Sequence, residues 1–508
     1  MNPNEDPRKS TEVKTYKEMP FTFKQLLSEG YHDCSATCFI KNVYSLSSVE
    51  GYLPRSNMSY VYDPVDRLLY VMGGYITDEQ SDMIEKSGEI HKQMIIHVMN
   101  VDTHNWYTIP SKEYHITYDL CDPLKHRRHL FKNAFVQRYG QKSAFYDRKI
   151  FIFGGSTRPK EEKMSELSHV ECFNLETRQW SIPTVSGQMP IRTMCHASAY
   201  SAHDWYIHGG FLCSLYEGQF SNSLHHYDMR TNTISMVRPV ESELIMQDMY
   251  MDCHSMVYIG DFLYLFGGRL RNTRGEINRL SNRLYSFNLT SKKWINIQNQ
   301  GTYPEARRSH TATAYKQYMI VFGGCNVTSL HHFNDCHFFD TSVIQWFKIN
   351  ILGLRARPRR SHGCVLVDDS LIIFGGTAPK FEAKTDRGLL ERSFNGSQDN
   401  ALDDISDTII IEIFPKLKQR CIHVIIDNNI HFRTKLPKHI VRTVDEFIES
   451  MQQESDSPPK LIAFTCEATQ SESEHLPEKS IQLSQKIIEK WLSKDQRRGQ
   501  KRTKEQVR

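Results

Sequence analysis

The sequence predicts an all-β chain folded as a six-bladed β-propeller, and a repeated double glycine is the first observation that predicts it. The pair follows a short apolar run six times along the 508 residues. Its first glycine stands at Gly73, Gly154, Gly209, Gly267, Gly323 and Gly375. The first interval is 81 residues, and the other four lie between 52 and 58. A period of about 50 residues is typical of propellers whose blades each hold four strands.

Other residues recur at fixed places within the repeat. A histidine opens a strand upstream of the glycine pair in four units: His196, His254, His310 and His362. A tryptophan ends the unit in four: Trp106, Trp180, Trp294 and Trp346. We interpret these histidines and tryptophans as core and inter-blade packing residues rather than as ligands. Together with the repeat length they are typical of kelch repeats.

The ends of the repeat indicate how the ring closes. The sixth unit continues through a strand at 407–413 and then turns helix-like, so it lacks a fourth strand. The segment 21–27 near the N-terminus has a suitable length and alternation. We therefore predict that the propeller spans 21–413 and that 21–27 is the outer strand of blade six, which would leave no exposed sheet edge there.

The flanking segments differ from the propeller in composition. Residues 1–20 are expected to be disordered, and 451–508 to be a mostly disordered tail ending in a basic run at 497–504. That run is typical of a solvated tail, and alternatively of a nuclear-import or nucleic-acid patch. Residues 414–450 are expected to be helical.

Composition indicates a soluble intracellular chain without cofactor or metal. The net charge is only +4, no run of about 18 apolar residues is present, and no signal peptide is evident. The twelve cysteines are scattered, and the close group His32, Cys34 and Cys38 lacks the second ligand pair of a zinc site. We expect a cytoplasmic location, and a nuclear one if the basic tail is an import signal, with no membrane partner.

Two patterns in the predicted helical segment have the spacing of docking surfaces. Leu417, Cys421 and Ile425 stand four residues apart, so a helix places them on one stripe. The stripe either packs on the propeller or binds a partner, and it resembles the BC box that binds elongin C. A second array resembles the Cul2 box that selects that cullin; it comprises Leu436, Pro437, Ile440 and Val444.

From about residue 135 to 445 the chain resembles the kelch domain-containing protein 3 family, also called Peas. The segments that carry the resemblance are 180–187, 267–269 and 305–310, together with the two boxes. The resemblance implies a non-catalytic substrate receptor of an elongin B/C–Cul2–RBX1 ubiquitin ligase. Such receptors bind C-terminal degrons, which are protein tails that usually end in glycine, and direct their owners to ubiquitylation and proteasomal degradation.

The same resemblance implies a pocket for the free carboxylate of the degron. Arg269 and Arg274 keep the family's spacing after a glycine pair, and Arg308 and Ser309 match other positions that line the pocket. A guanidinium fork suits a carboxylate because it binds both oxygens at once. The alternative is that these arginines are solvated surface residues in turns.

Two other classes of function were weighed. Kelch-type enzymes include iron-dependent proteins with a Glu-x3-Asp-x3-His string, which this sequence lacks, and copper oxidases that are usually secreted. We therefore expect no enzyme. A kelch scaffold unrelated to ubiquitin, associated with chromatin or the cytoskeleton, stays open because of the basic tail.

Overall fold

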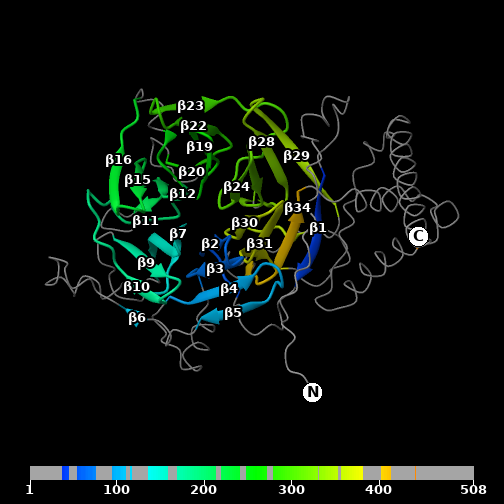
Figure 1. The fold of residues 1–508 in the computed structure, drawn as a ribbon. Coiled ribbons are helices and arrows are strands. Elements are labelled where there is room, and N and C mark those ends of the chain that lie inside the picture. The colour runs from blue at the N-terminus through cyan, green and yellow to red at the C-terminus, as the bar shows by residue number, and fades with distance from the viewer. Residues whose placement is uncertain are drawn as a thin grey trace, which may run out of the picture.

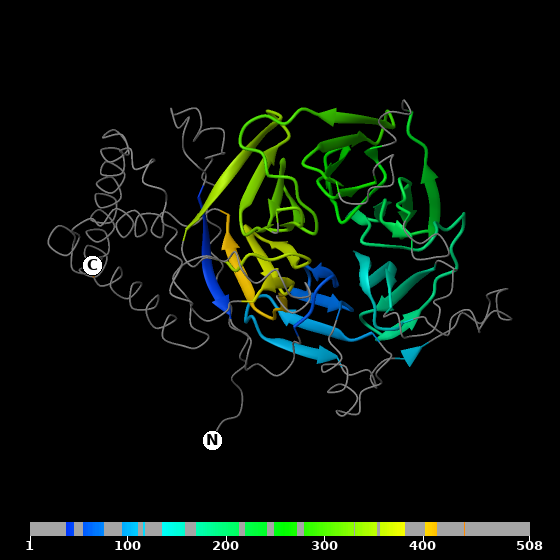
Figure 2. The ribbon, with the colours of Figure 1, turned by 180° about the vertical axis from the view of Figure 1, so that it is seen from behind.

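A computed structural model of the protein describes residues 37–44, 54–75, 94–109, 115–116, 135–157, 169–212, 219–240, 248–271, 279–329, 331–352, 356–380, 402–413 and 441. The strands form radial blades around a central axis (Figures 1 and 2). The predicted all-β, six-bladed propeller is confirmed. No helix within these ranges is long and apolar enough to cross a membrane.

Each blade is an antiparallel sheet in which successive strands pair from the inside of the ring outward. Blade one contains β2 (Ser59–Asp63), β3 (Leu68–Met72), β4 (Ile96–Asn100) and β5 (Trp106–Ile109). Blade two contains β7 (Tyr139–Tyr146), β8 (Lys149–Ser156), β9 (Val170–Asn174) and β10 (Gln179–Ser181). Blade three contains β12 (Ala197–Ser201), β13 (Asp204–His208), β15 (Leu224–Asp228) and β16 (Thr233–Val237).

The second half of the ring repeats this order. Blade four contains β18 (Ser255–Ile259), β19 (Phe262–Phe266), β22 (Leu284–Asn288) and β23 (Lys293–Ile297). Blade five contains β24 (Thr311–Tyr315), β25 (Tyr318–Phe322), β28 (Cys336–Asp340) and β29 (Gln345–Leu352). Blade six contains β30 (Gly363–Val367), β31 (Ser370–Phe374) and β34 (Thr408–Glu412).

The strand that completes blade six corrects the sequence analysis. Its place beside β34 is taken by β1 (Thr37–Tyr44), not by 21–27, which lie outside the described residues. β1 also pairs in parallel with β29, so it joins blades five and six into one sheet. The β1 sequence is richer in β-branched and aromatic residues than 21–27, and it lies closer along the chain to β2. The N-terminal part of the chain therefore closes the ring, but through a later segment.

Short strand pairs lie beyond the ends of the blades. They are β11 (Thr193–Met194) with β14 (Phe211–Leu212), β17 (Met251–Asp252) with β20 (Arg269–Leu270) and β21 (Arg279–Leu280), β26 (Cys325–Asn326) with β27 (His331–His332), and β32 (Thr377–Pro379) with β33 (Leu402–Asp404). A further strand, β6 (His115–Ile116), pairs in parallel with β10.

The apolar core lies between neighbouring blades rather than at one centre. Six buried clusters were found among the described residues, and each is built from two adjacent blades. The repeated tryptophans belong to these clusters, as predicted: Trp346 packs on Phe266 of the preceding blade with ring centroids 5.0 Å apart. Trp106 packs on Phe374 of blade six across the point where the ring closes.

The repeated histidines also link blades, as predicted. His310 bonds the Ser255 hydroxyl of blade four at 2.7 Å, and His362 bonds the Thr311 hydroxyl of blade five at 2.8 Å. His254 makes the corresponding bond to His208 of blade three at 3.0 Å. All of these imidazoles are buried. Their role is therefore structural.

The glycine pairs are the joints at which each blade meets the next. Gly267 has φ +70°, and a Cβ there would lie 2.8 Å from the His310 ring and 2.9 Å from the Arg307 carbonyl oxygen of the following blade. The amide of Gly268 donates to that same carbonyl at 2.8 Å. Glycine is required because the backbone is left-handed and the neighbouring blade leaves no space for a side chain.

One turn residue from each blade contributes to a closed ring of backbone hydrogen bonds around the axis, here called the turn ring. Each amide donates to the carbonyl of the preceding blade at 2.8–2.9 Å, and the amide of the first member donates to the last, which closes the circle. Every member has positive φ, between 53° and 73°. The members are Asn57, Gly140, Cys195, Cys253, Ser309 and Ser361.

Candidate functional site

The candidate site lies at the end of the propeller that carries the turn ring. β20 directly follows the glycine pair of blade four and pairs with β17, which directly precedes the ring member Cys253. Arg308 likewise directly precedes the ring member Ser309 in the chain. Chain continuity thus brings three of the four predicted carboxylate-binding residues, Arg269, Arg308 and Ser309, to the same end. Arg274 lies outside the described residues.

Arg269 is held in place by residues of its own chain. Its Nε donates to Asp252 Oδ1 at 2.9 Å and its Nη2 to Oδ2 at 2.5 Å. The guanidinium also lies 5.0 Å from the centre of the Phe220 ring. Asp252 is almost fully buried, whereas the Arg269 side chain is 19% exposed. One edge of the guanidinium fork is therefore occupied by Asp252, and only the Nη1 side remains for a ligand.

Arg307 and Arg308 are adjacent in sequence but opposite in environment. Arg307 is fully buried and bonded to Asp335 at 2.6 and 2.9 Å, and it also donates to the Gly323 carbonyl at 3.0 Å. Arg308 is partly exposed, and among the described residues its side chain has no hydrogen bond or ion pair; its Nε is buried without a partner. Arg307 is therefore structural, and Arg308 is available for binding.

Ser309 belongs to the turn ring, next to Arg308 in the chain. Its φ is 56°, its amide donates to the Cys253 carbonyl at 2.9 Å, and the residue borders the central cavity. The backbone hydrogen bond within the turn ring fixes the position of Ser309, and its hydroxyl makes no hydrogen bond to another described residue. This placement is compatible with the predicted role beside Arg308.

The structure adds Arg360, which the sequence analysis did not select. Arg359 and Arg360 repeat the arrangement of blade five: Arg359 is fully buried and bonded to Asp407 at 2.7 Å, while Arg360 is partly exposed. Among the described residues, the side chain of Arg360 makes one long hydrogen bond, 3.9 Å from Nη1 to Cys325 Sγ. The sequence signal was the Arg-Arg-Ser-His string, which occurs at 307–310 and again at 359–362.

Arg269, Arg308 and Arg360 are here called the basic mouth. Burial lowers the pKa of His332 to about 4, and the charges of Arg360 and Arg308 add to the effect, which places both guanidiniums near this imidazole. The pKa of Cys253 is raised, first by its contact with Cys195 and then by burial, while Arg308 opposes the shift. Positive charge is therefore concentrated at this end, although Asp252 is paired with Arg269, and Asp404 is close enough to Arg360 for that arginine to oppose the rise of its pKa.

No cluster of three or more metal-ligating side chains occurs within the ranges that the structure describes. Every residue predicted to bind elongin C or the cullin lies outside those ranges. These are Leu417, Cys421, Ile425, Leu436, Pro437, Ile440 and Val444. Their roles stay predictions.

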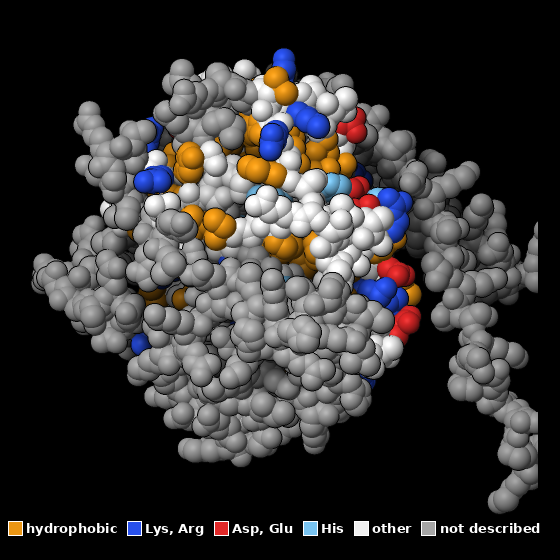
Figure 3. Space-filling model, turned by 90° about the vertical axis from the view of Figure 1, so that its left-hand side faces the viewer, with side chains coloured by type: hydrophobic (Ala, Val, Ile, Leu, Met, Phe, Trp, Pro, Cys, Tyr) orange, Lys and Arg blue, Asp and Glu red, His pale blue; other side chains and the backbone are white. Residues whose placement is uncertain are grey.

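On the side of the propeller seen in Figure 3, the described residues show no comparable concentration of one charge. In Figure 3 hydrophobic side chains and Lys or Arg side chains alternate over the face in view, and the acidic side chains lie beside basic ones. Exposed apolar residues on the rim occur singly on outer strands, such as Met236 on β16 and Ile295 on β23. Scattered exposed apolar residues are normal for a protein surface.

Six blades joined by double glycines define a kelch-repeat β-propeller, a class that generally serves as a non-catalytic interaction module. A family model described as the KLHDC2/KLHL20/DRC7 Kelch-repeats domain matches residues 65–248 and 140–376. The chain belongs to this family of kelch-repeat proteins. The resemblance predicted from the sequence is thereby confirmed at the level of the family.

Individual relatives agree with this assignment. The chain is 28% identical to kelch domain-containing protein 3 of Rattus norvegicus over 388 residues, which are 75% of this chain and 90% of that protein. It is also 28% identical to the Homo sapiens protein of that name over 391 residues, with the same coverage. Similarity to host cell factor 1 of Homo sapiens is more limited: 26% over 263 residues, 48% of this chain and 12% of that protein.

Proposed function

We propose that this protein is the substrate-recognition subunit of an elongin B/C–Cul2–RBX1 ubiquitin ligase and that it binds glycine-ended C-terminal degrons at the basic mouth. The observation that supports the binding site best is the contrast between Arg307 and Arg308. The Arg308 guanidinium is partly buried beside the axis and has no hydrogen-bond partner in the described part of the chain, so a bound carboxylate would offset its desolvation cost. The similarity to kelch domain-containing protein 3 over most of the chain supports the same proposal.

The proposed chemistry needs a free chain end. A terminal carboxylate would accept hydrogen bonds from Arg308 and Arg360, and from the unoccupied side of Arg269. A preference for glycine follows if the backbone around the turn ring closes over the terminal Cα and leaves no space for a Cβ. The ligase role assigns no catalytic residue to this chain, because the transfer of ubiquitin would take place on other subunits.

A peptide titration tests the binding site. A glycine-ended peptide selected from a C-terminal library should bind about ten- to a hundredfold more tightly as the free acid than as the amide, since a hydrogen bond to a charged group contributes about 1.5–3 kcal/mol. Extension by one residue should weaken binding similarly. Fluorescence polarisation with all three peptides measures the difference.

Two variants make this experiment specific. Arg308→Ala should abolish the discrimination between acid and amide, because it removes an arginine that no described residue holds by a side-chain hydrogen bond or ion pair. Arg230→Ala is the matched control, since Arg230 is 59% exposed and, within the described ranges, forms an ion pair with Asp228 alone. Arg269→Ala is less informative because it leaves Asp252 buried without its cation. Equal binding of acid, amide and extended peptide to the unaltered protein would refute the degron site.

A second experiment tests the ligase assignment independently of the pocket. Leu417→Ala should remove an apolar anchor that contributes about 2–3 kcal/mol when buried, so affinity for elongin B/C should fall about a hundredfold. Adding Cys421→Phe should abolish co-purification. Pro437→Ala with Ile440→Ala should reduce binding of Cul2 but not of elongin C, which is a separation that simple packing on the propeller does not produce. Wild-type recovery of elongin B/C by the Leu417/Cys421 double variant, with normal folding, would exclude the BC box.

A kelch scaffold without a ubiquitin role is the second candidate. The observation that favours it is that the propeller also matches host cell factor 1, a protein with a different name and much greater length. A pull-down probed for elongin C and Cul2 distinguishes the two candidates, because the scaffold would recover neither.

A further inference from the structure

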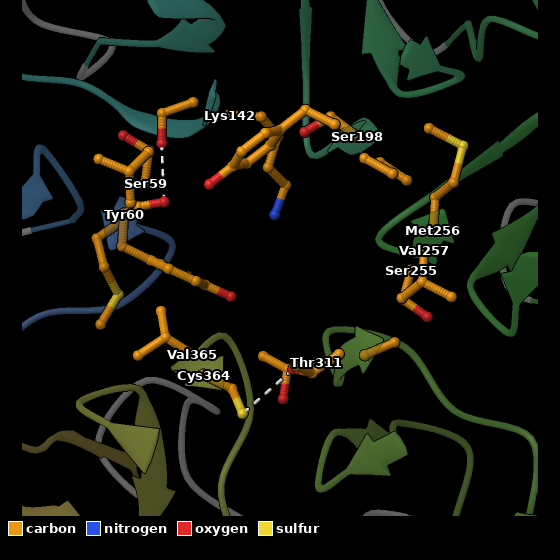
Figure 4. A pocket seen from close by; sticks show the side chains of 18 of the residues that line it. Ser59, Tyr60, Lys142, Ser198, Ser255, Met256, Val257, Thr311, Cys364 and Val365 are labelled. Atoms are coloured by element: carbon orange, nitrogen blue, oxygen red, sulfur yellow. Dashed lines mark hydrogen bonds between the residues drawn. The ribbon is translucent and has the colours of Figure 1, made fainter. Parts of the chain in front are cut away.

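The axis of the propeller contains a cavity that is separate from the basic mouth. Its volume is about 540 Å³, and it is bordered by the turn ring at one end and by the six innermost strands β2, β7, β12, β18, β24 and β30 around its sides. Lys142 of β7 and Tyr60 of β2 direct their polar ends into the open centre of this cavity (Figure 4). A space of this size can hold a small molecule.

The charge inside the cavity is unbalanced. No aspartate or glutamate is among the described residues that line it, and Lys142 is the only lysine or arginine. Four histidines also border it, but burial lowers the pKa of His196 and of His310 to about 3 and holds those of His254 and His362 well below the usual value, so they are neutral at pH 7. Lys142 is therefore the one side chain of this lining that can supply a positive charge at neutral pH.

Lys142 is a costly residue in this position. Among the described residues its ammonium group has no hydrogen bond and no ion pair, and burial lowers its pKa, opposed only by the nearby thiols of Cys195 and Cys253. The Lys142 side chain is only partly exposed, so its unpaired ammonium is incompletely hydrated, which is unfavourable. An anion inside the cavity would remove that cost by pairing with it.

The rest of the lining suits a small organic anion better than a hydrated ion. Tyr60 and Tyr200 are hydroxyl donors in the lining, and burial raises the pKa of Tyr200 to about 12, so its phenol stays protonated. Apolar side chains such as Met256 and Val365 also line the cavity (Figure 4). One positive charge, phenol donors and apolar walls match a carboxylate attached to a compact apolar body.

We propose that the central cavity is a binding site for a small organic monocarboxylate, with Lys142 as its charge partner. None of the three arginines of the basic mouth borders the cavity, although Ser309 of the turn ring, which we also assign to the degron site, does. The proposed cavity site does not depend on the ligase role. The carboxylate could belong to a free small molecule or to the end of a peptide, and the experiment separates these two sources.

Isothermal titration of the full chain with benzoate, and with its neutral isostere benzamide, tests the proposal. Benzoate should bind, and benzamide should bind at least about tenfold more weakly, because it lacks the charge that pairs with Lys142. Lys142→Met should weaken benzoate binding by about tenfold or more without lowering the melting temperature, since it removes a desolvated charge. Lys142→Arg should retain most of the affinity.

The basic mouth supplies the matched control. Arg308→Ala should leave benzoate binding unchanged while it reduces binding of the glycine-ended peptide, and Lys142→Met should have the opposite pattern. Loss of peptide binding in Lys142→Met would identify a chain end as the occupant of the cavity in place of a free small molecule. The proposal is wrong if benzoate and benzamide bind equally, if neither binds, or if benzoate binds Lys142→Met as well as the unaltered protein.

Discussion

Arg307→Ala should reduce the free energy of unfolding by about 3–5 kcal/mol, the usual cost of removing one partner of a buried ion pair. The Arg307 guanidinium is fully buried, bonds both oxygens of Asp335 and lies 3.9 Å from the centre of the Phe333 ring. Alanine would leave Asp335 and the Gly323 carbonyl without their donor. Urea unfolding measures the loss.

The adjacent arginine is the matched control for this experiment. Arg308→Ala changes the same residue type one position along, but it removes no described ion pair, so we expect less than about 1 kcal/mol. Arg307→Lys should still destabilise, because an ammonium cannot reproduce the two parallel hydrogen bonds of a guanidinium fork. Similar losses for Arg307→Ala and Arg308→Ala would contradict the division into a structural and a binding arginine.

The propeller should lose several kcal/mol of stability between pH 7.5 and pH 5. Burial lowers the pKa of His196, His208 and His310 to about 3, whereas an unfolded chain protonates histidine near its ordinary value of about 6.5. The unfolded state therefore binds more protons as the pH falls through 6.5, and stability declines until about pH 3. At pH 5 each of these histidines contributes a loss of about 2 kcal/mol.

Urea unfolding at several pH values tests this expectation. The carboxylates whose pKa the fold lowers, such as Asp335, titrate below about pH 4, so the interval from pH 6.5 to 5 reports mainly the histidines. His310→Gln should make the dependence shallower by the equivalent of one proton, though it also removes the bond to Ser255. A free energy of unfolding that stays constant from pH 7.5 to 5 would show that these imidazoles are not buried as neutral groups.

The propeller was predictable because its residues repeat. A glycine pair is needed wherever one blade meets the next at a left-handed backbone, and the same steric reason applies at Gly267 as at Gly323. Tryptophans and histidines recur for the same reason, since equivalent positions contact equivalent neighbours. The closing strand was misassigned because it occurs once: pairing with β34 depends on an edge supplied about 370 residues later in the chain.

The candidate site was predictable in position but not in detail. The arginines of blades four and five were selected because they match positions that line the pocket in the kelch domain-containing protein 3 family. The sequence did not show which arginine is available to bind a ligand. Arg307 and Arg308 are the same residue type, and only the twist of the chain into β24 decides that Arg307 is the buried one. Likewise, no local pattern indicated that Arg269 is bonded to Asp252, 17 residues earlier.

By itself the sequence determined the class of fold, the number of blades, the inter-blade roles of glycine, tryptophan and histidine, and the family. Those features follow from local backbone geometry and from contacts repeated in every blade. Only the tertiary structure decided the closing strand, the turn ring and the isolation of Lys142. The turn ring is formed by four different residue types, and the environment of Lys142 arises from six strands far apart in the chain. Such features depend on distances across the ring, which periodicity along the chain does not encode.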